Sequence, residues 1–186
     1  DIGTTGCKAV VFDDDGRELA LAYRDYPIRT PREGWAELDS GEILDKCMAV
    51  IREAADGSHE TVQGLGISSQ GEAVTPVGRG GEILGGGMVS TDTRAADIAK
   101  HWSKTFGREK LYRITGHTAH PMFSLFKLLW LRDNRPDIWK QASGFYCYED
   151  LLHRRLGLEP AISWPMAGRT MLFDVTKHEW SGEILE

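Results

Sequence analysis

The first eight residues, Asp1 to Lys8, constrain the chain more than any other stretch. They run from an acid through Gly3, Thr4, Thr5 and a second glycine, and then directly into the apolar β-type segment 9–12. The N–H groups and hydroxyls of so small a turn can converge on an anion, and glycine lets the backbone approach closely. An acid beside such a turn suits Mg²⁺, which takes one or two carboxylates together with phosphate oxygens. We therefore predict a nucleotide-phosphate turn between two strands, unlike a P-loop, which precedes a helix. The alternative is a polar hairpin turn that binds nothing.

A hairpin also needs a first strand, yet only Asp1 and Ile2 precede this turn. Either the first strand is two or three residues long, or the chain is a fragment cut inside that strand. We favour the fragment. The 186 residues suffice for one domain, and such a chain buries roughly 70% of its unfolded surface.

Composition excludes several classes of function. The net charge is −6 and no basic block occurs, which disfavours nucleic acid and anionic membranes as partners. The longest apolar-rich run, residues 125–131, is interrupted by Lys127 and is too short to span a bilayer. The three cysteines form no CxxC pair, so neither a zinc site nor a disulfide framework is indicated, and a cytoplasmic location is expected.

The apolar pattern predicts one mixed α/β domain. The turn Asp14–Gly16 should join two strands within residues 7–28. We interpret the acids Asp13 to Asp15 as part of a solvated turn rather than as a metal site. Asp39 or Ser40 should cap a helix over 41–55. A buried strand is expected at 62–68, with further strands at 73–77, 82–89 and 171–175. The other expected helices are 93–106, 108–114, 124–134, 148–156 and one that follows Ser181.

Polar residues follow two of these strands. Gln70 and Glu72 come after the first, and Asp92 and Arg94 come after the second. Side chains at strand ends often line ligand clefts, and this mixture of donors and acceptors suits a sugar or polyol. The alternative is a surface turn with Asp92 as a helix cap and Arg94 solvated. His117 and His120 read more simply as ordinary loop histidines than as metal ligands.

An ordered set of motifs resembles the FGGY carbohydrate kinases, relatives of glycerol kinase, xylulokinase and gluconokinase in the actin/hexokinase/Hsp70 superfamily. The opening motif alone is shared across that superfamily, whereas the ordered set is specific and runs through nearly the whole chain. Its members are the residue stretches 1–13, 66–72, 92–94, 114–116, 127–131 with Pro136, 149–151, 155–157, and 167–174 with Trp180.

The resemblance implies an actin-like, RNase H-like domain with a mixed β-sheet and flanking helices. It also implies a second domain of the same fold, absent here, and a cytoplasmic enzyme that uses ATP and Mg²⁺ to phosphorylate a sugar or polyol. The isolated domain would be inactive, and the intact protein is a candidate homodimer. By motif match, Asp1 would organise Mg²⁺ through water and Gly3, Thr4, Thr5 and Lys8 would face the phosphates. Gln70, Glu72, Asp92 and Arg94 would lie near the sugar.

Two positions depart from the family pattern. Gly71-Glu72 matches neither the Arg-Glu of glycerol kinases nor the Met-His of xylulokinases, so neither specificity carries over. The family's catalytic aspartate falls on Ser163, and a serine does not act as a base near neutral pH without help. Either another carboxylate substitutes, Glu159 being the nearest in sequence, or the protein is a catalytically impaired sugar- or nucleotide-binding relative. An Hsp70-like ATPase is disfavoured by the polar residues at the two strand ends.

Overall fold

The computed structural model describes residues 1–186 and begins with an antiparallel hairpin. Strands β1 (Gly6–Phe12) and β2 (Glu18–Asp25) are joined by the predicted acidic turn. The Asp13 carboxylate accepts hydrogen bonds from the N–H groups of Asp15 (3.0 Å) and Arg17 (2.8 Å). Gly16 has a φ of +79°, which explains the glycine. The prediction of a solvated turn here is confirmed.

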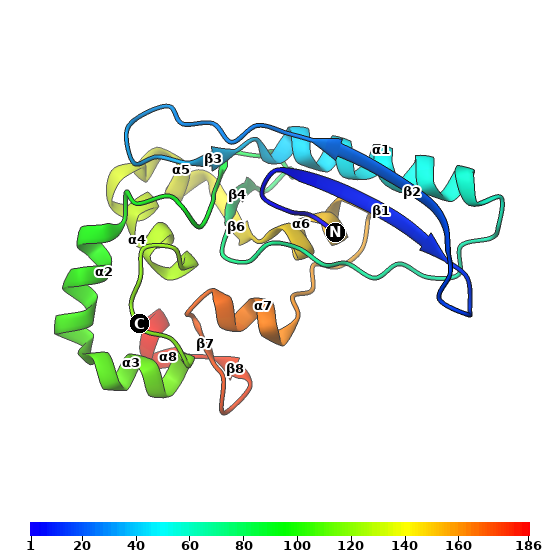
Figure 1. Ribbon diagram of the computed structural model, residues 1–186. Coiled ribbons are helices and arrows are strands. Elements are labelled where there is room, and N and C mark those ends of the chain that lie inside the picture. The colour runs from blue at the N-terminus through cyan, green and yellow to red at the C-terminus, as the bar shows by residue number, and fades with distance from the viewer.

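A long amphipathic helix packs along this hairpin (Figure 1). Helix α1 (Ser40–Ser58) begins after Asp39, whose carboxylate accepts the N–H of Glu42 at 3.0 Å, and it ends at the left-handed His59. The helix is three residues longer at its C-terminus than the prediction of 41–55. Its buried stripe of Ile43, Leu44, Cys47, Val50 and Ala54 contributes to the first hydrophobic core. A sequence spacing of three or four residues places these side chains on one face.

The remaining strands are short antiparallel pairs. They are β3 (Glu37–Leu38) with β5 (Gly87–Met88), β4 (Thr75–Gly78) with β6 (Ala142–Tyr146), and β7 (Phe173–Asp174) with β8 (Glu179–Trp180). The predicted strand at 82–89 is reduced to β5. Residues 85–87 are three successive glycines, of which the last begins β5. Glycine weakens a strand interior, which explains why the strand is short.

The prediction of a buried strand at 62–68 is wrong. Residues 62–68 belong to no strand, and Val62 and Leu65 are exposed. A single parallel bridge joins Ile2 to Ser69, with the Ile2 N–H donating to Ser68 O and the Gln70 N–H donating to Ile2 O, each at 2.8 Å. Apolar content indicates a strand only where a neighbouring strand supplies partners, and no strand of this chain pairs with residues 62–67.

The second half of the chain is mostly helical, as predicted. A π-helical turn at Ser103–Gly107 joins α2 (Ala96–Trp102) to α3 (Arg108–Thr115). Helix α4 (Ser124–Asn134) has the predicted bounds, and α6 (Tyr148–Arg155) and α8 (Gly182–Leu185) also follow the prediction closely. Helices α5 (Pro136–Gln141) and α7 (Trp164–Arg169) were not predicted. Each has proline in its first turn, where the missing N–H costs nothing, so proline starts a helix here rather than interrupting one.

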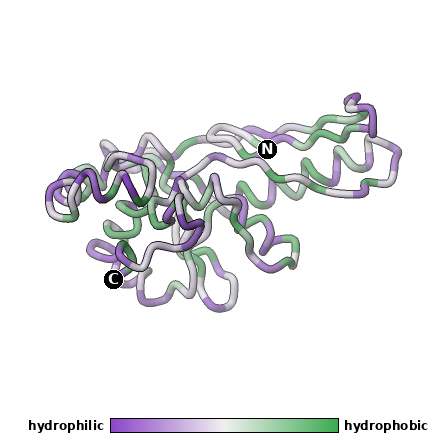
Figure 2. Tube along the Cα trace, turned by 90° about the horizontal axis from the view of Figure 1, so that it is seen from below, coloured by the Kyte–Doolittle hydropathy of each residue, from purple (hydrophilic) through white to green (hydrophobic).

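Two hydrophobic cores result. The first lies between the hairpin, α1 and α6, and the second joins α2, α3 and α4 to the segment around Met171. In Figure 1 the N-terminus lies beside α6, between the hairpin and α7. Figure 2 shows the apolar stretches along the hairpin and the helices, with polar residues at the tips of the turns. No helix combines the length and apolar character that crossing a membrane requires.

Candidate functional site

The N-terminal turn is held by the backbone. The Gly3 N–H donates to Gly6 O at 2.9 Å, the Lys8 N–H donates to Asp1 O at 2.9 Å, and the Tyr26 hydroxyl donates to Gly3 O at 2.7 Å. A Cβ on Gly3 would lie 3.1 Å from the Gly6 carbonyl oxygen, so the close turn favours glycine. Thr5 remains exposed. Thr5 is therefore accessible in the turn, and phosphate binding there stays a prediction.

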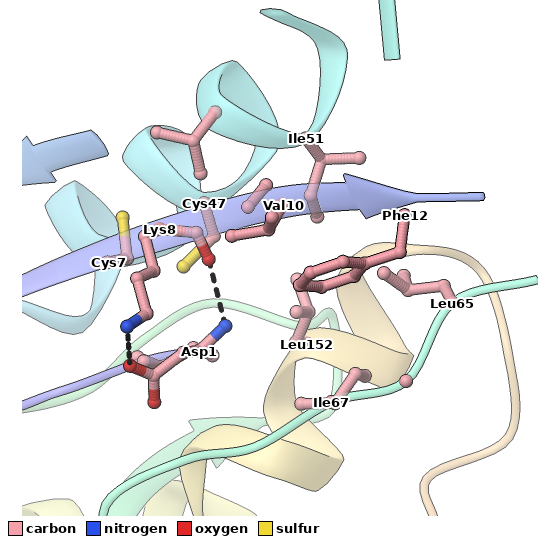
Figure 3. A pocket seen from close by; sticks show the side chains of 14 residues that line it. Asp1, Cys7, Lys8, Val10, Phe12, Cys47, Ile51, Leu65, Ile67 and Leu152 are labelled. Carbon is pink, nitrogen blue, oxygen red and sulfur yellow. Dashed lines mark hydrogen bonds and ion pairs between the residues drawn. The ribbon is translucent and has the colours of Figure 1, made fainter. Parts of the chain in front are cut away.

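Asp1 and Lys8 lie side by side at the edge of this turn (Figure 3). Their charged groups are 3.8 Å apart, and the side chains are 47% and 50% exposed. They border a groove of about 330 Å³ whose walls are mainly apolar side chains of β1, α1 and the 65–67 segment. Such walls do not suit a polyhydroxyl compound. A single accessible carboxylate beside the turn does suit Mg²⁺ that is also held by water and phosphate oxygens.

The side chain of Gln70 connects the turn to the first predicted substrate segment. Its Nε2 donates to Gly3 O at 3.1 Å, and its Oε1 accepts from the Thr4 hydroxyl at 3.3 Å. Sequence reasoning placed Gln70 and Thr4 in two separate groups of functional residues. The structure brings those two groups into direct contact.

Glu72 occupies a constrained position in that same segment. Its φ is +62°, unusual for a residue other than glycine, and the residue is only 3% exposed. Its carboxylate pairs with Arg169, at the end of α7. Its backbone carbonyl accepts from the Ser124 hydroxyl at 3.0 Å and from Lys127 Nζ at 3.3 Å. Helices α4 and α7 thus hold this residue from two sides.

Asp92 and Arg94 form a buried ion pair, with side chains 1% and 2% exposed. Arg94 Nε and Nη2 donate to the Asp92 carboxylate at 2.9 and 2.6 Å, while Arg94 Nη1 lies 2.7 Å from Glu37 Oε1. The guanidinium carbon lies 3.7 Å from the ring centre of Trp35. The alternative prediction of a solvated Arg94 is therefore wrong, and Asp92 is not the cap of α2, whose N-terminal cap is Ala95.

Lys127 links the two substrate segments, a role that sequence reasoning missed. Its fully buried ammonium donates to Glu72 O and, at 2.9 Å, to Met88 O just before the 90–94 segment. Burial lowers the pKa of Lys127 to about 7, although nearby Asp92 favours the charged form. The lysine that interrupts the apolar run 125–131 was the available sequence clue. Asp92 and Arg94 therefore lie close to the Gln70–Glu72 segment.

Ser163 does not contact these residues. It is exposed at the start of α7, where its N–H and hydroxyl donate to Glu149 Oε2 at 3.1 and 2.9 Å. The following residue on α6, Asp150, is buried, and one of its carboxylate oxygens has no hydrogen-bond partner. Burial raises the pKa of Asp150 to about 7. His117 packs against Phe123, whose ring lies 5.1 Å from the Arg169 guanidinium carbon, and His120 Nδ1 accepts the Met122 N–H.

The whole chain, residues 1–186, matches the model of the N-terminal domain of the FGGY family of carbohydrate kinases. This chain belongs to that family. A glycerol kinase of Thermococcus onnurineus is 30% identical over 193 residues, a match that covers 100% of this chain and 39% of the relative. The L-xylulose/3-keto-L-gulonate kinase of Escherichia coli is 33% identical over 155 residues, covering 82% of this chain and 31% of that kinase.

The FGGY fold is equally clear from solved structures. The gluconate kinase of Lactobacillus acidophilus superimposes with a TM-score of 0.93 at 26% identity, over 99% of this chain and 37% of that protein. The predicted actin-like fold is therefore confirmed, although the strands of this chain form four separate two-stranded antiparallel sheets rather than one mixed sheet. The chain spans about 39% of the length of the first glycerol kinase.

Proposed function

We propose that this FGGY domain forms the sugar-binding half of a kinase that transfers the γ-phosphoryl group of ATP to a sugar or polyol hydroxyl. The observation that carries the proposal is the Gln70 side chain, which hydrogen-bonds both Gly3 and Thr4 of the N-terminal turn. A phosphate group on the turn and a hydroxyl compound beside Gln70 would be neighbours. Phosphoryl transfer depends mainly on such positioning and on neutralisation of charge.

The turn would hold the phosphates through Gly3, Thr4 and Thr5, with Lys8 as an additional cation at its edge. Asp1 would hold Mg²⁺ through water, because its carboxylate is accessible beside the turn. Magnesium, when bound there, neutralises phosphate charge. This chain's own contribution is to fix the acceptor hydroxyl against that turn.

The substrate would lie beside Gln70, with Glu72, Asp92 and Arg94 buried behind that surface. Arginines fix the buried carboxylates of Glu72 and Asp92, which would hold the 70–72 and 90–94 segments in place behind the substrate. A Cβ on Gly71 would lie 3.3 Å from Arg169 Nε, so the arginine that pairs with Glu72 also packs closely against Gly71. We infer a substrate with several hydroxyl groups, a class that includes the pentuloses, polyols and sugar acids.

The test is sugar-dependent release of ADP from the full-length protein, measured with Mg-ATP and a panel of polyols, ketoses, aldoses and sugar acids. The proposal predicts that at least one compound raises ADP release at least a hundredfold above the rate with ATP and water alone. Thr4→Val is expected to reduce that rate, whereas Thr105→Val, on the distant π-helical turn, serves as the matched control. Absence of stimulation by every compound would contradict the proposal.

The alternative is a catalytically impaired relative that binds sugar or nucleotide, and Ser163 at the expected aspartate position favours it. This candidate predicts binding of a sugar, measured by calorimetry, without turnover. An active kinase and an impaired relative therefore differ in one measurement, the sugar-dependent release of ADP by the same protein with the same panel of compounds.

A further inference from the structure

The charged side chains that hold the 70–72 and 90–94 segments differ in exposure, and Arg169 is the accessible one. Its side chain, at the end of α7, is 37% exposed. The other charged side chains that link these segments are at most 4% exposed; they are Glu72, Asp92, Arg94 and Lys127. A compound that binds beside Gln70 therefore meets the guanidinium group of Arg169 before it meets these buried charges.

Arg169 also packs against the residue that follows Gln70. A Cβ on Gly71 would lie 3.3 Å from Arg169 Nε and 3.4 Å from Arg169 Cγ, so a larger residue at position 71 would displace the arginine. The Gln70 amide in turn hydrogen-bonds Gly3 and Thr4 of the N-terminal turn. Arg169 and Gln70 are thus neighbouring polar groups on the surface that borders this turn.

The guanidinium group of Arg169 is held in place by the protein itself. Nη2 pairs with the buried carboxylate of Glu72, and the guanidinium carbon lies 5.1 Å from the ring centre of Phe123. Nε and Nη1 donate no hydrogen bond within the chain. Donor nitrogens in a fixed plane are therefore left for a ligand, and a preorganised donor loses little conformational freedom on binding.

The hydrogen-bonding character of Arg169 decides which group of a substrate suits it. Guanidinium nitrogens donate hydrogen bonds and accept none. A hydroxyl that accepts from Arg169 still needs an acceptor for its own proton, and the nearby Glu72 carboxylate is buried and already paired. A carbonyl or carboxylate oxygen carries no proton, and its planar lone pairs match the planar donors. A hydroxyl is better placed beside Gln70, whose amide both donates and accepts.

We propose that Arg169 is a specificity-determining residue that contacts the substrate and selects compounds with a carbonyl or carboxylate oxygen, the ketoses and sugar acids, over polyols. The inference rests on the proposed function above and narrows its substrate class. A polyol would place a hydroxyl against a group that only donates. A site built around one kind of hydrogen-bonding group rejects an analogue that cannot satisfy it.

The test measures kcat/KM of the full-length protein with matched pairs of compounds and Mg-ATP. Each ketose is paired with the polyol formed by reducing its carbonyl group, and each sugar acid with the polyol of the same carbon skeleton. In the best pair, the native protein should favour the ketose or sugar acid at least tenfold. Arg169→Lys keeps the positive charge beside Glu72 but loses the planar donors. It should lower kcat/KM for that compound about tenfold, the effect of one charge-assisted hydrogen bond, and for its polyol less than threefold.

The matched control is Arg132→Lys, which alters an exposed pair with Asp133 and should change neither value. Gly71→Ala is a second, independent variant, because its Cβ would displace the guanidinium without removing its charge. It should also reduce the preference for the carbonyl or carboxylate compound, by about threefold. Urea denaturation shows whether each variant is folded, and Gly71→Ala decides the outcome if Arg169→Lys is not.

Two results would overturn the role of Arg169 while leaving the kinase function intact. One is a native protein that prefers the polyol of every pair. The other is an equal loss of kcat/KM for both members of a pair in the folded variant, as expected if the arginine only supports the structure. An unsubstituted protein whose ADP release no compound stimulates would overturn the proposed function as well.

Discussion

The two halves of the candidate site are built in opposite ways. The phosphate half, Asp1 to Lys8, is an exposed turn held by backbone hydrogen bonds, and its one ion pair is about half exposed to solvent. The proposed sugar half is a network of charged side chains that are almost fully buried, centred on Glu72, the Asp92–Arg94 pair and Lys127. Gln70 joins the two halves.

This difference suggests how the two halves respond to change. Backbone N–H groups recognise any phosphate and tolerate changes of side chain, whereas buried charges depend on every partner. Substitutions in the sugar half should therefore affect stability and substrate binding together. Substitutions in the phosphate half should affect nucleotide binding alone.

The largest effect is expected from Arg94→Met. The change leaves the Asp92 carboxylate buried without its cation, and breaking such a pair costs roughly 3–5 kcal/mol. The free energy of unfolding, measured by urea denaturation, should fall by that amount. Arg135→Met removes an exposed pair with Asp137 and should cost less than about 1 kcal/mol. Equal losses in the two variants would contradict the contrast between buried and exposed charges.

The next effect concerns Asp150, the buried acid on α6. The folded pKa of Asp150 is raised by burial from 3.8 to about 7, so the folded state keeps a proton that the unfolded chain loses above pH 4. Stability from this group is present below pH 4 and is lost as the pH rises towards 7. Asp150→Asn, which has no charge to bury, should exceed the native protein in stability by on the order of 2 kcal/mol at pH 8.

The control for this effect is Asp97→Asn, an exposed acid in the first turn of α2. Urea midpoints at pH 4 and pH 8 should show a pH-dependent gain for Asp150→Asn and none for Asp97→Asn. If the difference in stability between Asp150→Asn and the native protein were the same at pH 4 and pH 8, Asp150 would ionise normally.

Much of this arrangement could be predicted from the sequence, because local patterns carry it. The Asp13–Gly16 turn, the Asp39 cap and the apolar stripe of α1 each lie within a few residues of what they determine. The prediction of a buried strand at 62–68 failed because a strand needs a pairing partner that is distant in sequence. The one bridge formed next to this segment joins Ile2 to Ser69. Helices α5 and α7 were missed because proline starts a helix as readily as it ends one.

The candidate site also divides into features that local sequence patterns predict and features that depend on distant contacts. The prediction of a phosphate turn rests on consecutive residues, and the family pattern pointed to Gln70 and Glu72; both roles stay predictions. Lys127 and Arg169 could not be assigned, because their roles depend on contacts between residues 39 to 97 positions apart. No spacing rule predicts such contacts, although a lysine within an apolar run does indicate a buried charge that needs acceptors.

A smaller effect is expected from Lys127→Met in the full-length protein. Methionine fills similar volume but gives up the two hydrogen bonds that tie Glu72 O to Met88 O. The KM for the sugar should rise about tenfold, equivalent to about 1.4 kcal/mol, while KM for ATP stays within twofold. Lys110→Met, which removes an exposed pair with Glu183, should change neither constant. An equal rise in KM for ATP would contradict the separation of the two halves.

The smallest effect on stability is expected from Lys8→Gln in the phosphate half. The Lys8–Asp1 pair is half exposed and 3.8 Å long, so its loss should change the free energy of unfolding by no more than about 0.5 kcal/mol. If Lys8 faces the phosphates, KM for ATP should nevertheless rise about threefold, since a cation near the triphosphate is lost, and KM for the sugar should be unchanged. Steady-state kinetics on the full-length protein, with urea denaturation alongside, measures both quantities. A larger change in KM for the sugar than for ATP would place Lys8 with the sugar half, and the exposed turn would no longer be a separate phosphate site.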